Sequence, residues 1–238
     1  PDSYAIDVSR RHRWIRGDWQ LAGWLLPTVP GADQSQGSKA RRQPTPLSAL
    51  SRWKLFDNLR RSLVSPALFA LLIGGWLFGP GPAWFWSLVV VMMVFMSPLH
   101  STLIEFIRKP AERAWLVHLI QTARSADRPM AHAFLTFTLL PYETLISLDA
   151  ILRSGVRMLF TRRGLLLWHT TSYARRNARR TLADFFSEMW VAPVVTLAPA
   201  VALSGAELLL SAPVLLLWLV SPAIAWWISL PLVSPVPD

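Results

Sequence analysis

The sequence has no cysteine among its 238 residues. This absence excludes a disulfide scaffold, a thiolate metal site and catalysis by a cysteine nucleophile. Charge is also missing from two long stretches. Residues 63–100 hold no acidic or basic residue, and residues 189–238 hold no Lys or Arg and only Glu207 and Asp238. Two nearly uncharged blocks therefore alternate with two charged ones.

The charged blocks are basic. The chain has 24 Lys and Arg against 14 Asp and Glu, a net charge of +10, yet 53% of its residues are hydrophobic and the mean hydropathy is +0.35. This combination fits a membrane protein with a basic face better than a nucleic-acid-binding domain, so no nucleic-acid partner is expected. The sequence begins with Pro1 and has no recognisable signal peptide, and we expect it to be a piece of a longer protein.

The first apolar block, residues 63–100, predicts a transmembrane hairpin. It is interrupted by "GPGP" at residues 79–82, which cannot continue a helix because proline lacks the backbone donor and clashes with the preceding turn. Each half is close to the length that crosses a bilayer. Trp76, Trp84 and Trp86 bracket the turn, where an interfacial aromatic belt is expected.

The second apolar block, residues 189–232, predicts another hairpin. "SGAE" at residues 204–207 is the favoured break, and "SAP" at residues 211–213 is the alternative. Prolines inside such spans are tolerated where neighbouring helices satisfy the freed carbonyls. Four prolines lie inside the block: Pro193, Pro199, Pro213 and Pro222.

The charges predict the topology. Every Lys and Arg lies outside the two inter-span turns, and basic segments remain cytoplasmic. The N-terminus, residues 101–188 and the C-terminus, with its tail of residues 233–238, are therefore predicted to be cytoplasmic. Residues 130–163 are predicted to form an interfacial helix, with a fifth span as the alternative. Four charged residues argue against a full crossing: Glu143, Asp149, Arg153 and Arg157.

Residues 47–62 predict an amphipathic helix that lies in the headgroup plane and leads into the first span. The apolar face of this helix is formed by Leu50, Trp53, Phe56, Leu59 and Leu63.

Residues 27–46 are rich in Pro, Gly, Ser and Gln, and predict a flexible linker. The expected fold is mainly α, with two transmembrane hairpins of about four spans, interfacial helices and no complete soluble catalytic domain.

The stretch "SRRHRWIRGDWQ" begins at Ser9 and concentrates arginine and tryptophan. We expect a helix over residues 7–24 with Asp7 or Ser9 near its N-cap. A solvated basic helix beside the membrane is the simplest interpretation of this pattern.

A binding function is the alternative for the same helix. Arg10, Arg13 and Trp14 are spaced to share one face. The planar fork of arginine suits phosphate oxygens, and a tryptophan offers a flat apolar platform to a sugar ring. The face therefore suits a sugar beside a diphosphate.

The residues also carry a resemblance. "RRHRW" is similar to the Q/R-x-x-R-W motif of processive membrane glycosyltransferases of the cellulose, chitin and hyaluronan synthase type. The longer strings "RRHRWIRGDWQ", "TPLSALSRWKLFDNLRRSLV" and "LPYETLISLDAILR" resemble the bacterial cyclic β-1,2-glucan synthases, across most of residues 1–232.

The resemblance implies a multi-pass inner-membrane protein that extends a β-1,2-glucan chain from UDP-glucose. Residues 1–26 would end its glycosyltransferase region, with Arg10 and Arg13 at the donor diphosphate and Trp14 on the acceptor glucose. The other candidate site residues of the same string, without a defined role, are Arg16, Asp18, Trp19 and Gln20.

The resemblance also implies what lies elsewhere in the polypeptide. An upstream catalytic domain would supply a carboxylate base and a divalent Mg or Mn ion for inverting transfer. A downstream soluble domain would resemble glycoside phosphorylases. The expected partners are therefore UDP-glucose, the growing glucan, membrane lipids and these two domains, and this chain alone is expected to be inactive.

The segment "LLLWHTTSYARR", residues 165–176, has two interpretations. It resembles weakly the gating loop of cellulose synthases, which would give Thr170, Thr171 and Arg175 a place over the nucleotide. The alternative is a basic loop on lipid headgroups.

For the whole chain, the alternative function is a non-catalytic membrane anchor or transporter subunit whose basic helices bind lipid. A third option is that the helices line a glucan channel.

Overall fold

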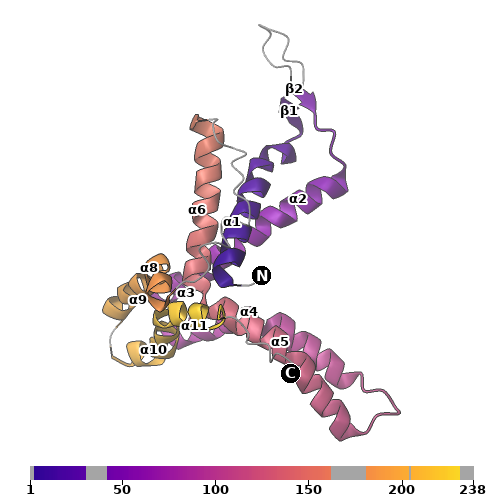
Figure 1. Cartoon of the computed structure of the whole chain (residues 1–238), viewed down its shortest axis with the longest axis vertical. Coiled ribbons are helices and arrows are strands. Elements are labelled where there is room, and N and C mark those ends of the chain that lie inside the picture. The colour runs from indigo at the N-terminus through magenta and orange to yellow at the C-terminus, as the bar shows by residue number, and fades with distance from the viewer. Residues whose placement is uncertain (1–2, 31–41, 162–180, 204, 231–238) are drawn as a thin grey trace, which may run out of the picture. The chain divides into compact units, whose positions relative to one another are not determined.

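The structure, a computed structural model, describes residues 3–30, 42–161, 181–203 and 205–230. These residues are almost entirely helical, with one pair of very short strands (Figure 1). The prediction of a mainly α fold is confirmed. The chain divides into two compact units. The first holds residues 1–66, 144–180 and 226–238, and the second holds residues 67–143 and 181–225.

The first unit begins with α1 (Tyr4–Gln20) and a short 3₁₀ helix, η1 (Ala22–Leu25). Strand β1 (Thr28–Pro30) pairs antiparallel with β2 (Arg42–Pro44), with Thr28 opposite Pro44. The strands occupy the two ends of the predicted linker. Helix α2 (Ala49–Ser62) follows, capped by the Ser48 hydroxyl, which accepts from the backbone N–H of Ser51 at 3.2 Å.

Helix α2 is amphipathic, but its apolar residues divide between two surroundings. Leu55 and Leu59 are buried on the side that packs against α1 and η1. Leu50, Trp53 and Phe56 remain 63%, 63% and 46% exposed. Leu59 therefore belongs to the packed side of the helix, and the other three form an uncovered apolar face.

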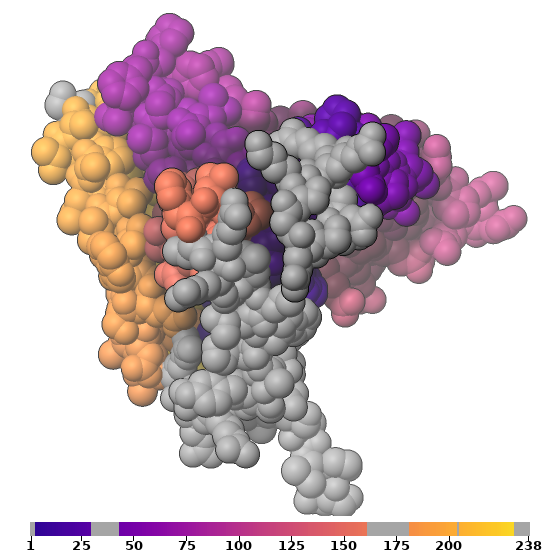
Figure 2. Space-filling model, turned by 90° about the horizontal axis from the view of Figure 1, so that it is seen from above, coloured from indigo at the N-terminus to yellow at the C-terminus, as the bar shows by residue number. Residues whose placement is uncertain are grey.

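The second unit contains most of α3 (Val64–Phe78), followed by α4 (Ala83–Ile107) and α5 (Trp115–Thr138). The chain turns between α3 and α4 at the predicted "GPGP", where Gly81 has a φ of 86° that favours glycine. Helices α4 and α5 form a long hairpin, whose outer end stands clear of the orange and yellow helices of the same unit in Figure 2. A hydrogen bond of 2.6 Å from Ser125 to Glu105 joins the two helices there.

A single helix over residues 130–163 is the wrong prediction. Helix α5 continues to Thr138 and α6 (Leu140–Val156) starts directly after it, followed by a π-helical turn, η2 (Arg157–Thr161). Pro141 explains the break, because proline fits the first turn of a helix but cannot continue the preceding one. Helix α6 belongs to the first unit from Thr144 onward.

The second apolar block folds into α8 (Leu182–Glu188), α9 (Val191–Ala202), α10 (Gly205–Leu219) and α11 (Ser221–Trp227). The break between α9 and α10 falls at the predicted "SGAE", and Gly205 has a φ of 56°. Pro213 lies inside α10, so the alternative break at "SAP" is wrong.

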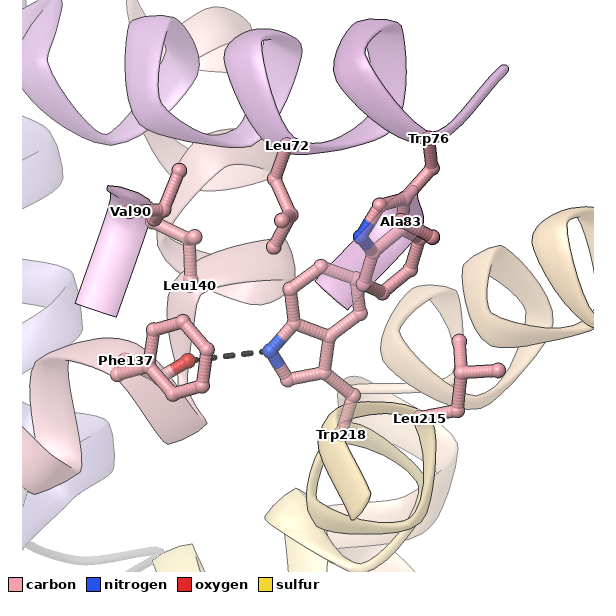
Figure 3. Close-up of a cluster of buried hydrophobic side chains, with 8 residues drawn as sticks. All are labelled: Leu72, Trp76, Ala83, Val90, Phe137, Leu140, Leu215 and Trp218. Carbon is pink, nitrogen blue, oxygen red and sulfur yellow. Dashed lines mark hydrogen bonds between the residues drawn. The ribbon is translucent and has the colours of Figure 1, made fainter. Parts of the chain in front are cut away.

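The core of the second unit is built around Trp218, which is fully buried (Figure 3). Its indole N–H donates to the carbonyl of Phe137 at 3.1 Å, and its ring lies 5.9 Å from that of Trp76. The Trp76 N–H donates in turn to the Ser87 hydroxyl at 3.0 Å. Both buried indoles therefore have a hydrogen-bond partner, as burial requires. Leu72, Ala83, Val90, Leu140 and Leu215 complete the cluster.

Within the part of the chain that the structure describes, α4 alone is long and apolar enough to cross a membrane as a single helix. Four bent pairs of helices pass the same test when each pair is taken as one span: α2 with α3, α5 with α6 and η2, α8 with α9, and α10 with α11. The structure is therefore compatible with one to five spans, a range that includes the predicted four.

Candidate functional site: the arginine–tryptophan face of α1

Helix α1 begins earlier than the sequence suggests. Ser3 is its N-cap, and the Ser3 hydroxyl accepts from the N–H of Ile6 at 3.5 Å. Asp7 lies in the first turn and the helix ends at Gln20, so the N-cap at Asp7 or Ser9 and the C-terminal bound at residue 24 are wrong. A carboxylate in the first turn is stabilised by the positive end of the helix dipole, and Asp7 also pairs with two arginines.

Two of the three residues of the predicted face, Arg10 and Trp14, are in contact. The guanidinium of Arg10 lies over the indole of Trp14, 4.9 Å from the ring centroid. Asp7 forms ion pairs with Arg10 and with Arg11, the latter at 2.8 Å. Trp14 remains 60% exposed. Asp7 therefore holds a cation against one face of an indole that stays open to solvent, a cation–π arrangement.

Arg13 precedes Trp14 directly and lies half-buried on the same helix. It is three residues from Arg10, the spacing that puts neighbouring turns of a helix side by side. The structure thus brings Arg10 and Trp14 into contact and places Arg13 on the adjoining part of the helix.

The end of the string has a structural role. The Trp19 indole N–H donates to the Ser62 hydroxyl at 2.9 Å, and the Asn58 amide donates to Asp18 at 3.3 Å. Both contacts join α1 to α2. Burial raises the pKa of Asp18, and the hydrogen bond from Asn58 opposes that rise. Gln20 is half-buried at the last residue of α1.

A set of contacts on the far side of α1 was not anticipated. His12 Nε2 lies 2.9 Å from a carboxylate oxygen of Asp149, and the Ser154 hydroxyl donates to the Arg16 carbonyl at 3.3 Å. These contacts hold α1 beside α6 (Figure 1). Burial lowers the pKa of His12 although Asp149 opposes the shift. His12 and its partner Asp149 are 137 residues apart in the sequence, so this contact can be recognised only from the fold.

Among the residues that the structure describes, no group of three or more His, Asp or Glu side chains could hold a metal ion. Thr170, Thr171 and Arg175 lie outside the described residues.

The observed class is a mainly helical, membrane-compatible protein that has a basic, tryptophan-bearing helix and apolar helical hairpins. No protein-family model matches the chain. The chain is 32% identical over 236 residues, 96% of its length, to the cyclic beta-(1,2)-glucan synthase NdvB of Rhizobium meliloti (strain 1021). It spans only 8% of the length of that protein. The resemblance to a segment of a cyclic β-1,2-glucan synthase is thereby confirmed.

Proposed function

We propose that this chain contributes the acceptor and diphosphate site, together with membrane helices, to a processive glucosyltransferase that builds β-1,2-glucan from UDP-glucose. The similarity to a cyclic β-(1,2)-glucan synthase supports the substrate class. The observation that carries the site is the exposed indole of Trp14 with the Arg10 guanidinium held against it by Asp7.

Trp14 is the acceptor platform in this proposal. The indole exposes enough area to stack on the apolar face of a glucose ring, and it does so with few rotatable bonds to immobilise. Arg10 covers one side of the ring, so a sugar is accepted from the remaining exposed side. A single sugar-sized platform suits an enzyme that extends one chain repeatedly.

The arginines serve the leaving group. During transfer, an acceptor hydroxyl oxygen forms a bond to the anomeric carbon while the bond from that carbon to the UDP oxygen breaks. The hydroxyl proton passes to a carboxylate supplied by another part of the polypeptide. Arg10 and Arg13 stabilise the negative charge that develops on the diphosphate. A divalent ion, bound by that other part, would supply further charge stabilisation.

The membrane arrangement belongs to the same proposal. The hairpins α3–α4 and α9–α10 anchor the site in the bacterial inner membrane or line a path for the glucan. Both chain ends lie in the cytoplasm, because Lys and Arg are absent from both inter-span turns.

A second candidate function has its own observation. Leu50, Trp53 and Phe56 of α2 form an uncovered apolar face, next to Arg52 and Lys54 in the sequence. Such a helix binds an anionic lipid surface. On this view the chain is a non-catalytic membrane anchor, and the basic residues of α1 also serve lipid binding.

The deciding experiment is UDP-glucose turnover by the longer membrane protein that carries this chain. Trp14→Ala and Arg13→Ala should each reduce glucan synthesis at least a hundredfold while membrane insertion is unchanged. Trp53→Ala is the matched control, because Trp53 is 63% exposed on the neighbouring helix, close to the 60% of Trp14. Full activity in both α1 variants would refute the site and favour the anchor.

A further inference from the structure

The outer half of the α4–α5 hairpin, residues 99–128, is held together by its own contacts (Figure 1). His118 is buried, and its Nε2 lies 3.1 Å from the carbonyl oxygen of Phe106. The Ser125 hydroxyl donates to Glu105, and the rings of Phe106 and Trp115 lie 6.3 Å apart. Both helices of this half therefore pack against each other, and the side chains that remain exposed are not needed for that packing.

Helix α5 exposes large apolar side chains in this half. Leu116 is 69% exposed, and Leu119 and Ile120 are exposed as well. Their spacing of three and four residues puts them on one face of the helix. His118 and Thr122, in contrast, are buried on the face that packs against α4. The exposed apolar face of α5 is therefore distinct from its packed face.

Helix α4 carries an exposed apolar stripe that continues into the outer half. Its members follow one another at intervals of three or four residues: Met92, Met96, Leu99, Leu103 and Ile107. At about 100° per residue, this stripe and the apolar face of α5 each lie about a third of a turn from the packed face of their helix, in the same rotational sense. In an antiparallel pair, this relation places both on one side of the hairpin, the apolar side.

The other side of the outer half is polar. Gln121, Arg124 and Arg128 are exposed and are spaced to share one face of α5. At the turn between the helices, the Lys109 ammonium lies 5.2 Å from the centroid of the exposed Trp115 ring. Five basic residues face three acidic ones in this half of the hairpin. Exposed tryptophan and basic residues beside an apolar surface are typical of helices at a lipid interface.

The charged residues decide how lipid meets this surface. If both helices crossed a bilayer along their whole length, Arg124, Asp127 and Arg128 would lie in hydrocarbon, at a cost of about 3 kcal/mol each. A hairpin that lies along the surface leaves them among headgroups and water. Each helix has a proline where the outer half begins, Pro98 in α4 and Pro129 in α5. Helices bend at proline, because it removes a backbone hydrogen bond.

We propose that the outer half of the α4–α5 hairpin lies on an anionic bilayer surface, with its apolar side buried among the lipid chains. The stripe of α4 favours lipid as the occupant, because it continues the apolar surface of the helix that alone, among the described residues, is long and apolar enough to cross a membrane. The excess of basic residues suits anionic headgroups. This inference does not depend on glucan synthesis.

A direct test is possible because the 238-residue chain has no cysteine. The chain is reconstituted in phosphatidylcholine vesicles that contain phosphatidylglycerol, and one introduced cysteine at a time is labelled with a fluorescent dye. Leu116→Cys and Ile120→Cys report on the apolar side, and Gln121→Cys and Arg124→Cys are matched controls on the polar side of the same helix. All four side chains are exposed, so no substitution removes a packed side chain.

Nitroxide-labelled lipid quenches the dye from the bilayer, and acrylamide quenches it from water. Lipid quenching should be at least fivefold stronger for the apolar-side labels, and acrylamide should show the reverse order. Equal access of acrylamide to all four labels would overturn the proposal, because the hairpin would then lie clear of the membrane. Equal lipid quenching would also overturn it, because the hairpin would then cross the bilayer. Apolar-side labels shielded from both quenchers would replace lipid with a protein contact.

Two further comparisons test the charge and the independence of the site. In vesicles of phosphatidylcholine alone, lipid quenching of the apolar-side labels should fall at least twofold, and an unchanged value would overturn the part assigned to the basic residues. Trp14→Ala, which tests the proposed acceptor site, should leave all four signals unchanged. Failure of the lipid surface can therefore be distinguished from failure of the proposed function.

Discussion

Glu207 of α10 accepts a hydrogen bond of 2.6 Å from the backbone N–H of Ala83, the first residue of α4. The N-cap of α4 is Pro82, which provides no side-chain acceptor. A residue 124 positions further along the chain therefore caps this helix. Glu207 is the only charged residue in the described part of the second apolar block. Its carboxylate caps the N-terminus of α4.

Loss of the Glu207 cap should destabilise the second unit. We expect Glu207→Ala to lower the free energy of unfolding by about 1–2 kcal/mol, because it removes both the acceptor and a negative charge at a helix N-terminus. Glu207→Gln retains an acceptor and should lose less than half as much. Denaturant unfolding in detergent micelles measures both. Wild-type stability in the alanine variant would show that the contact contributes nothing.

Two adjacent glycines of α3 should respond in opposite directions to alanine. A Cβ on Gly75 would lie 2.4 Å from the Trp86 ring, whereas a Cβ on Gly74 would meet nothing within 4 Å. Gly75→Ala should cost about 1–3 kcal/mol through overpacking. Gly74→Ala should stabilise by about 0.5–1 kcal/mol through helix propensity. Thermal unfolding of the two variants provides the comparison, and equal effects would place Trp86 away from α3.

The hydrogen bond donated by the Trp218 indole should add to the stability that burial of its ring provides. Trp218→Phe keeps a large aromatic ring but leaves the buried Phe137 carbonyl without this donor. We expect a loss of about 1–3 kcal/mol from the missing hydrogen bond at this buried carbonyl, in addition to the cost of the smaller ring. Trp227→Phe is the control, since Trp227 is 68% exposed. Denaturant midpoints should fall for the first variant and stay unchanged for the second.

Local chemistry made the hairpin breaks predictable. "GPGP" and "SGAE" end helices because of proline and glycine at those positions, and no distant contact is needed to recognise them. The Arg10–Trp14 pair was predictable for the same reason, since it depends on spacing within one helix.

The remaining features depend on tertiary contacts. Trp19 finds Ser62 on α2, and Glu207 caps α4, although each pair is far apart in the sequence. The start of α1 was misplaced because Ser3, Asp7 and Ser9 are all good capping residues, and the ion pairs of Asp7 with Arg10 and Arg11 favour a place inside the helix. Single-sequence periodicity carries none of this information.

The stability of the first unit should fall in acid because of His12. Burial lowers the pKa of His12 in the folded chain, whereas the unfolded side chain titrates at about 6.5. Above that pH both states are neutral at this residue and the stability is fully present. As the pH falls below about 6.5, the unfolded state takes up the proton first, and stability is lost until the folded pKa is passed.

The pH dependence can be assigned to His12 by substitution. The charged groups around it are Asp149, which favours the proton, and Arg16 and Arg153, which disfavour it. His12→Gln keeps a donor for Asp149 but cannot titrate, so its free energy of unfolding should change less between pH 7 and pH 5 than that of the wild type. Denaturant unfolding at a series of pH values measures the difference. Identical slopes would mean that His12 titrates alike in the folded and unfolded states and that its burial beside α6 is wrong.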